Sequence, residues 1–258
     1  MKLKVHCPQK KGMGFEDMHR RIGRIAERMK ALSDKSGVGI PSVILFHESS
    51  LKYSFEIRQD EVLSCVDRMQ KLLPSDQWVA VAFAVLQNNE GEISNMGYAF
   101  TKQIYGFQPK REMSNGDSAA IEKYFGNDIS ALNWYAGKWE VNAYLLEKSN
   151  TPFLEMETPD GQKLEFRICR DITLDRFNYA PEKITLVMAD GLPLGLERDF
   201  SHLRKGVIVN DAKRGLLVAP KQFSRDMFTL SRYGEKTLSL YETDYAQDDS
   251  SCLFCNLN

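Results

Sequence analysis

The sequence predicts an α/β protein in which helices cover a central β-sheet. Near the start of the chain, apolar runs typical of buried strands alternate with segments of helical periodicity. Hydrophobic residues make up 43% of the chain and charged residues 27%, the balance of a globular protein with a sizeable core. The 258 residues contain no internal repeat and no linker rich in Pro, Ser or Gly, so we expect a single domain over residues 1–245.

The opening segment is predicted to run strand, helix, strand, helix, strand. The three strands are expected at residues 2–8, 42–46 and 78–86, and the last two are continuous apolar runs that suit burial on both faces. The two helices are expected at residues 15–33 and 59–73, where apolar residues recur with a period of about 3.6. This order favours a layered sheet with helices packed against it.

From Ile93 onward the pattern favours paired strands. Strand-like composition recurs at residues 96–103, 139–146, 153–157, 164–169, 184–188, 206–209, 216–218 and 238–241. Thr158-Pro-Asp-Gly161 is a turn sequence, because Pro fixes φ and Gly tolerates a positive φ. A hairpin is therefore expected around this turn. The end of the chain, residues 246–258, contains Asp-Asp-Ser-Ser and is expected to be a flexible tail.

Charge and cysteine content narrow the classes of function. The 34 Lys and Arg against 35 Asp and Glu give a net charge of −1, which gives no reason to expect nucleic acid or an anionic membrane as the main partner. No apolar run approaches the roughly 20 residues of a membrane-spanning helix, and the N-terminus resembles a strand rather than a signal peptide. The five cysteines are scattered, which argues against a disulfide framework. We therefore expect a cytoplasmic protein without a transmembrane segment.

Three residues with chemical potential stand at predicted strand ends. Glu48 follows the apolar strand Ser42-Val-Ile-Leu-Phe, and Lys110 follows Tyr105-Gly-Phe-Gln-Pro. Cys169 ends the second strand of the predicted hairpin, in Arg-Ile-Cys169-Arg-Asp171. A strand cysteine on its own is more often inert core than nucleophile, so the cysteine alone predicts little.

The ordered set of Phe-His-Glu48, Phe-Gln-Pro-Lys110 and Arg-Ile-Cys169-Arg-Asp171 resembles the motifs of the nitrilase, or carbon–nitrogen hydrolase, superfamily. The resemblance runs from Lys2 to about Pro220 and implies a four-layer α-β-β-α sandwich. His47 stands where that family generally has Pro, and the segment after Cys169 is shorter than usual. The later segment from Ile208 to Gly215 resembles the family's strand-Asn-x-x-Gly sequence.

The resemblance implies a role for each of these residues. Cys169 would be the nucleophile and Glu48 the general base. Lys110 and the backbone N–H of Arg170 would together stabilise the negative charge of the tetrahedral intermediate. Glu122 would hold the lysine in place, although Asp117 or Glu112 could take that part; Lys102 and Arg111 are rivals for the position of Lys110. A free thiol has a pKa near about 8.5, so we expect the pKa of Cys169 to be lowered.

These roles predict hydrolysis of a non-peptide carbon–nitrogen bond, in a small-molecule amide, through a thioester on Cys169. An N-acyltransferase would use the same residues, and a true nitrilase or a catalytically inactive binding protein with this fold are further alternatives. No metal or organic cofactor is implied. By resemblance, a homodimer would pair sheets from two chains into a larger stack.

Two cysteines near the end of the chain allow other interpretations. Cys255 is fourth from the end, the position of a prenylated cysteine, and Cys252 could be an acylation site. Asn256 and Asn258 fit the prenylation motif poorly, and Cys252-x-x-Cys255 has no second pair to complete a zinc site. We favour an unmodified tail without a lipid anchor.

Overall fold

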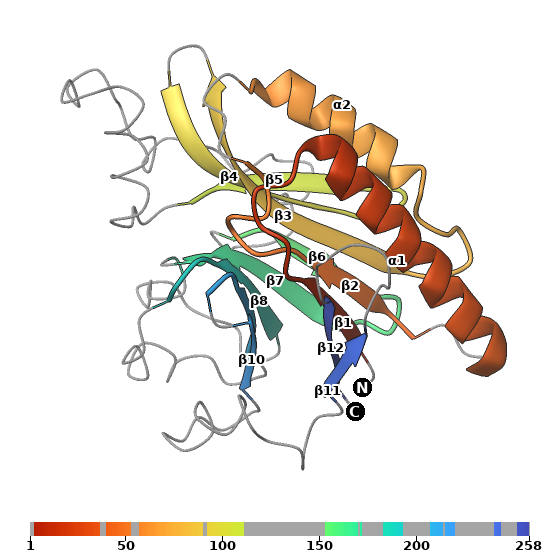
Figure 1. Ribbon diagram of the computed structural model, residues 1–258. Coiled ribbons are helices and arrows are strands. Elements are labelled where there is room, and N and C mark those ends of the chain that lie inside the picture. Colours follow the sequence, from red (N-terminus) through yellow and green to blue (C-terminus); the bar gives the residue numbers. More distant parts are fainter. Residues whose placement is uncertain are drawn as a thin grey trace.

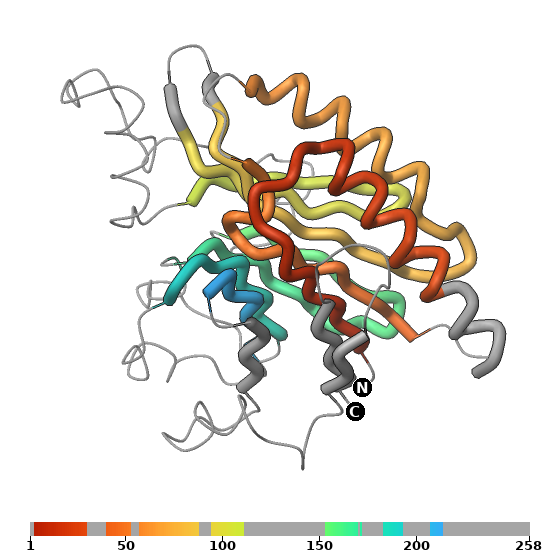
Figure 2. The backbone as a smooth tube through the Cα atoms, in the orientation of Figure 1, coloured from red at the N-terminus to blue at the C-terminus, as the bar shows by residue number. Residues whose placement is uncertain are grey.

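Two β-sheets packed face to face form the body of the molecule, and two helices cover the outer face of the larger sheet (Figure 1). The computed structural model describes residues 3–36, 40–52, 57–89, 92–110, 153–169, 171, 183–192, 207–213, 215–219, 240–243 and 252–257. The path of the chain through these layers can be followed in Figure 2.

The first sheet has seven strands in the order β11-β12-β1-β2-β3-β4-β5. Strands β1, β2 and β3 are parallel, and the remaining neighbours pair antiparallel. The strands are β1 (Leu3–Pro8), β2 (Ser42–Leu45), β3 (Val79–Asn89), β4 (Glu92–Phe100), β5 (Tyr105–Pro109), β11 (Leu240–Thr243) and β12 (Cys252–Leu257). The predicted opening from the first to the third strand is confirmed.

The second sheet has five strands in the order β10-β9-β8-β7-β6. The turn Thr158–Gly161 joins β6 to β7 as expected, and Gly161 has a φ of 80° that favours glycine. The strands are β6 (Glu155–Glu157), β7 (Lys163–Ile168), β8 (Lys183–Ala189), β9 (Val207–Asp211) and β10 (Gly215–Ala219). The strand expected at residues 139–146 lies outside the described residues.

Helices α1 (Phe15–Ser36) and α2 (Gln59–Gln70) follow the amphipathic pattern of the sequence. Met18 and Ile22 of α1 and Val66 of α2 are buried in one cluster with Val81 and Phe83 of β3. These contacts form the helical layer on the first sheet. A second helical layer, which would cover the other sheet, falls on residues outside the described part of the chain.

Part of the tail predicted at residues 246–258 forms a regular strand instead. Residues Cys252–Leu257 form strand β12, which pairs antiparallel with β1 over the register Leu3↔Leu257 to Pro8↔Cys252. The two ends of the chain therefore lie side by side (Figure 1). The pairing satisfies backbone groups along the outer edge of β1, and Phe254 is a residue type enriched in strands.

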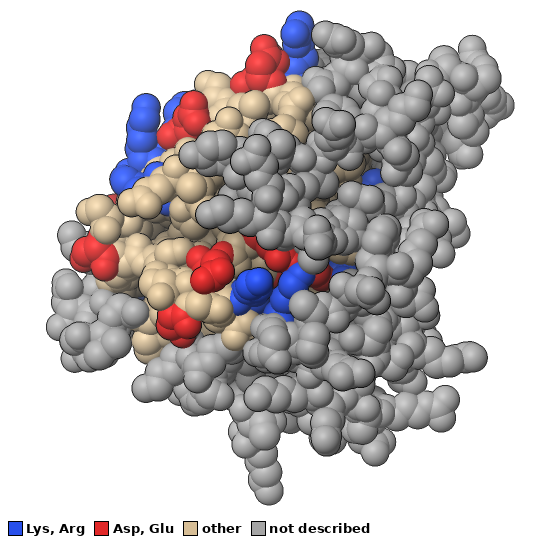
Figure 3. Space-filling model, turned by 180° about the vertical axis from the view of Figure 1, so that it is seen from behind, with Lys and Arg blue, Asp and Glu red and all other residues tan. Residues whose placement is uncertain are grey.

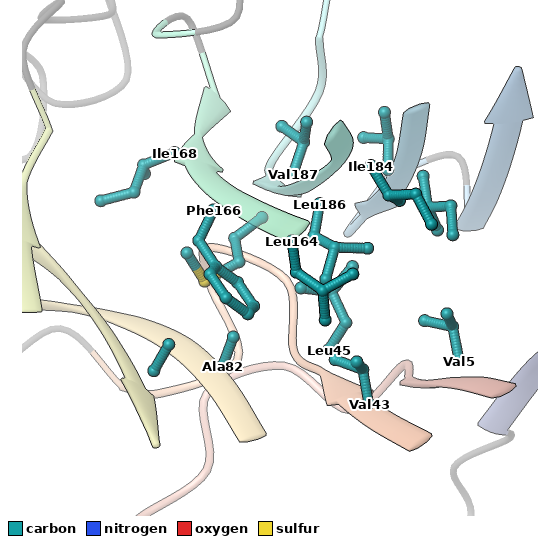
Figure 4. Packing of buried hydrophobic residues seen from close by; sticks show 14 of the residues in the cluster. Val5, Val43, Leu45, Ala82, Leu164, Phe166, Ile168, Ile184, Leu186 and Val187 are labelled. Carbon is teal, nitrogen blue, oxygen red and sulfur yellow. The ribbon is translucent and has the colours of Figure 1, made fainter. Parts of the chain in front are cut away.

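The space between the two sheets is filled by apolar side chains (Figure 4). Val43, Leu45 and Ala82 of the first sheet face Leu164 and Phe166 of the second. All five side chains are fully buried, and burying one of the larger ones contributes about 1.5–3 kcal/mol. This core fixes the distance between the sheets, and so the distance between residues at their edges.

Gly97 of β4 is a point of close approach between the sheets. A Cβ added there would lie 3.0 Å from Ile168 Cδ1 and 3.3 Å from Met188 Cε. We expect Gly97→Val to lower the free energy of unfolding by about 1–3 kcal/mol, because its methyl groups would overpack this contact. Chemical denaturation measures this change.

A glycine elsewhere in the chain supplies the control for that experiment. Gly23 lies in α1, and its added Cβ would meet Leu72 Cδ1 at 3.7 Å, an ordinary contact. Gly23→Ala is expected to raise the free energy of unfolding by about 0.5–1 kcal/mol through helix propensity. A Gly97→Val protein as stable as the native one would contradict the close approach of the sheets.

The surface of the described residues carries both signs of charge. On the face shown in Figure 3, Lys and Arg side chains are interspersed with Asp and Glu. Among the described helices, none combines the length and apolar character needed to cross a membrane.

Candidate active site

Strands β2, β5 and β7 bring their carboxyl ends to the same region between the two sheets. Glu48 lies just beyond β2, and its backbone N–H donates to Ala189 O of β8 at 3.4 Å. Lys110 directly follows β5, and its backbone N–H donates to Asn95 O of β4 at 2.7 Å. Cys169 directly follows β7. These backbone contacts hold Glu48 and Lys110, which are distant in sequence, near Cys169.

Glu48 and Lys110 form a buried ion pair. Lys110 Nζ donates to Glu48 Oε1 at 2.5 Å, and the two side chains are 0% and 5% exposed. Burial of both charges is costly unless they are paired and hydrogen-bonded, which is the arrangement seen. The pair places a carboxylate and an ammonium side by side in a region closed to bulk water.

Asn95 is a site residue that the sequence analysis did not identify. Its Nδ2 donates to Glu48 Oε1 at 2.8 Å, and the residue is buried. In β4, Met96 and Tyr98 belong to the cluster under the helices, so Asn95 lies on the face toward the second sheet. The sequence signal for Asn95 is a polar side chain on the inward face of an apolar strand. Such a residue indicates a polar partner nearby, because buried polar groups need hydrogen-bond partners.

Cys169 contacts the same carboxylate. Its side chain is hydrogen-bonded to the Glu48 side chain and to the backbone N–H of Asp190, and the residue is 4% exposed. Burial raises the pKa of the Cys169 thiol above its usual range, and the negative charge of Glu48 raises it further. Lys110 acts in the opposite direction without reversing the result.

The expectation of a lowered pKa at Cys169 is therefore wrong. The reason is that the thiol is nearly closed to water and lies beside the negatively charged carboxylate of Glu48. In the resting protein the proton stays on sulfur, and a thiolate forms only when a neighbouring base removes that proton. The arrangement suits general-base catalysis more than a preformed thiolate.

Two buried amide side chains join the sheets beside these residues. Gln108, two residues before Lys110, donates to Phe166 O of β7 at 2.6 Å and accepts from the backbone N–H of Leu154. Asn210 of β9 donates to Leu45 O at the end of β2 at 2.6 Å. These bridges fix β5 against β7 and β2 against β9, which are the strands that carry or flank the site.

Several predicted site residues fall elsewhere. Lys102 is exposed and donates to Lys71 O at 3.1 Å, so Lys110, not Lys102, is the lysine that contacts Glu48. The residues proposed to support the site or to compete with it lie outside the described residues: Arg111, Glu112, Asp117, Glu122 and Arg170. The described residues include no group of three or more His, Cys, Asp or Glu side chains placed to hold a metal ion.

His47, next to Glu48, is fully buried, and its Nδ1 lies 3.3 Å from Ser49 Oγ. Burial lowers the pKa of His47 from 6.5 to about 4, and that of His6 from 6.5 to about 3. Both imidazoles are therefore neutral in the folded protein at neutral pH.

Acid is expected to destabilise the protein through these two histidines. Between the unfolded pKa of 6.5 and the lower folded values, the unfolded chain binds more protons, so stability falls as pH falls. Near pH 5 the two groups together contribute a slope of about 2.7 kcal/mol per pH unit, from two protons at about 1.36 each. Urea denaturation at a series of pH values measures the slope. A His6→Gln/His47→Gln protein with the same slope would exclude this cause.

The two packed sheets, with helices on the outer face of the first, define the class of fold. The chain has the fold of the amidases of the nitrilase superfamily, shown by solved structures that match it along its whole length. An amidase from Nesterenkonia sp. matches with a TM-score of 0.58 and 10% identity, covering 100% of this chain and 90% of that one. A cysteine-to-serine variant of the Nesterenkonia AN1 amidase from the nitrilase superfamily matches with a TM-score of 0.59 and 9% identity, covering 100% and 92%.

A third solved structure concerns the chemistry of that amidase. A glutamate-to-glutamine variant of the Nesterenkonia sp. AN1 enzyme shows Michael addition of acrylamide at its active site cysteine. It matches with a TM-score of 0.57 and 9% identity and covers 100% of this chain and 93% of that one. No protein-family model matches the chain, and the search of curated proteins finds no match. The predicted nitrilase-like α/β fold class is thus confirmed by structure, with two sheets and one helical layer in the described residues, at a level of identity that sequence comparison does not detect.

Proposed function

We propose that the protein is a thiol-dependent hydrolase of a non-peptide carbon–nitrogen bond in small amides. The observation that carries the proposal is the convergence of Cys169, Glu48 and Lys110, with Glu48 in contact with both of the others. A nucleophile, a base within hydrogen-bonding reach and a fixed positive charge are the groups that acyl transfer requires.

In the first half-reaction, Glu48 takes the proton of the Cys169 thiol as sulfur attacks the amide carbon. The new carbon–sulfur bond forces the carbonyl electron pair onto oxygen, and the ammonium of Lys110 offsets the negative charge there. When the carbonyl re-forms, the carbon–nitrogen bond breaks and ammonia or an amine leaves with the proton that Glu48 holds. A thioester on Cys169 remains.

In the second half-reaction, Glu48 takes a proton from water as the water oxygen attacks the thioester carbon. The carbon–sulfur bond breaks, sulfur recovers the proton from Glu48, and a carboxylic acid is released. Because one carboxylate serves both halves, the mechanism needs no histidine. The raised pKa of the Cys169 thiol agrees with this scheme, since the sulfur is uncharged between turnovers.

The similar solved structures support the choice of substrate class. In one of them, a cysteine-to-alanine variant of the Nesterenkonia sp. AN1 amidase is in complex with butyramide. That protein shares 9% identity and the fold with this chain, so a small aliphatic amide is a first substrate to test here. The homodimer and the cytoplasmic location remain predictions from the sequence.

Intact-protein mass spectrometry with a panel of small amides tests the proposal. The native protein is expected to gain the mass of the acyl group and to release a carboxylic acid and ammonia. Cys169→Ala is expected to do neither. Release of ammonia by Cys169→Ala at the native rate would overturn the role of Cys169. Neither an adduct nor a product from any amide would favour the inactive binding protein. Transfer of the acyl group to an added amine, in preference to water, would indicate an acyltransferase.

A further inference from the structure

Cys169 has a backbone conformation that is unfavourable for a residue with a side chain. Its φ is 45°, and among the described residues it is the one non-glycine residue with a positive φ. The left-handed region costs an L-residue about 1–2 kcal/mol, so surrounding contacts must hold the chain in this state. The turn after β7 therefore needs a stabilising contact, and its own sequence identifies a candidate.

Arg167 makes that contact from two residues before the cysteine. Its Nη1 donates to Asp171 O at 3.2 Å. This hydrogen bond links residues 167 and 171 and so closes the turn that contains Cys169. Its Nε donates to Glu165 Oε1 at 2.6 Å, and its Cζ lies 4.2 Å from the centre of the Phe153 ring. The Arg167 side chain is 0% exposed.

The supports of Arg167 are themselves buried and fixed. Glu165 is 2% exposed, and its second carboxylate oxygen lies 3.8 Å from Lys183 Nζ of the neighbouring strand β8. Lys183 also contacts Glu155 of β6. A guanidinium anchored on one side by a carboxylate and on one face by an aromatic ring has few alternative rotamers. The arrangement is a rigid brace, defined here as Arg167, Glu165 and Phe153.

We propose that Arg167 is a positioning residue, which holds the turn at Cys169 so that the thiol stays aligned with Glu48 and the backbone N–H of Asp190. Arg167 acts through the backbone: the groups that shift the pKa of Cys169 are Glu48, Lys110 and Asp190, and its charge is not one of them. The inference rests on the proposed function, because alignment matters only if the thiol attacks a substrate.

Replacement of Arg167 by Lys tests this role. A lysine keeps the charge, but one ammonium cannot bond Glu165 Oε1 and Asp171 O while also stacking on Phe153. We expect kcat to fall about 10- to 100-fold with little change in KM, since misplacement of a reacting atom lowers the rate of chemistry. We also expect faster alkylation of Cys169 by iodoacetamide, because a relaxed turn exposes the thiol and its pKa moves toward about 8.5.

Cys7 of β1 is the internal control for alkylation. It is 0% exposed in the core between the sheets, so it reacts only when the whole protein opens. Peptide mass spectrometry is expected to show faster alkylation at Cys169 and an unchanged rate at Cys7. Equal acceleration at both cysteines would mean general unfolding and would overturn the proposal. Alkylation of Cys169 in the variant at the rate of the native protein would also overturn it.

Two further variants separate the brace from general stability. Val66→Ala removes apolar volume from the cluster between the helices and the first sheet, away from the brace, and it is expected to leave the alkylation of Cys169 relative to that of Cys7 unchanged. Phe153→Leu removes the ring under the guanidinium and is expected to accelerate alkylation by a smaller factor; it replaces Arg167→Lys if that variant does not fold. Alkylation needs no substrate, so these rates test the brace even if no amide is hydrolysed and the proposed function fails.

Discussion

Glu48→Gln is expected to remove amide turnover and, at the same time, to make Cys169 easier to alkylate. Turnover should fall by about 100- to 10,000-fold, the range for loss of a general acid–base group. Glutamine can occupy the same space and accept a hydrogen bond, but it cannot take the thiol proton or return it to the leaving amine. Both half-reactions proposed for this site depend on that exchange.

Alkylation should change in the opposite direction because Glu48 raises the pKa of Cys169. Its negative charge and its hydrogen bond both disfavour the thiolate, whereas Lys110 favours it. Without the carboxylate, the charge of Glu48 no longer opposes the effect of Lys110 on the sulfur, so the pKa of the thiol falls.

The pH dependence of iodoacetamide labelling measures this effect in Glu48→Gln and native protein. The midpoint at Cys169 is expected to shift to lower pH in the variant, with Cys7 protected in both. If Cys169 in Glu48→Gln labels more slowly than in the native protein, Glu48 does not restrain the thiol in the way the contacts indicate. Native turnover in the variant would exclude Glu48 as the base.

The parts of the site that follow from local sequence were predictable. Each of Glu48, Lys110 and Cys169 ends or follows an apolar strand, and strand ends are recognisable because the apolar period stops there. The hairpin around Thr158–Gly161 was equally accessible, since its Pro and Gly have fixed conformational roles. What these features share is that they depend on neighbours in the sequence.

The parts that depend on burial between distant strands were not predictable. Asn95 became a site residue because the inward face of β4 meets the region after β2, and one sequence does not give that register. The pKa of Cys169 was misjudged because it depends on how far water is excluded, which the residue type does not reveal. Strand β12 was missed because its pairing with β1 spans nearly the whole chain.

Lys110→Met is expected to inactivate the protein and also to destabilise it. The Lys110 side chain is 0% exposed and contacts Glu48 Oε1 at 2.5 Å, so the variant removes the cation that contacts this buried carboxylate. Removal of one partner from a buried pair costs about 3–5 kcal/mol. The pKa of the Cys169 thiol should rise further, since Lys110 is a group that lowers it. Alkylation should therefore slow, the reverse of the change in Glu48→Gln.

The double variant Glu48→Gln/Lys110→Met separates stability from chemistry. Replacing both partners of a buried ion pair by uncharged side chains of similar size is often neutral, so we expect unfolding in urea to return to within about 1 kcal/mol of the native value. Turnover should stay absent, because neither the base nor the fixed charge is restored. If the double variant is more stable than the sum of the two single losses predicts, the two substitutions are coupled, which would show that the ion pair exists in solution. Additive losses of stability would mean that the two side chains do not meet. Glu48 would then not lie beside the positive charge of Lys110, as the proposed acylation step requires.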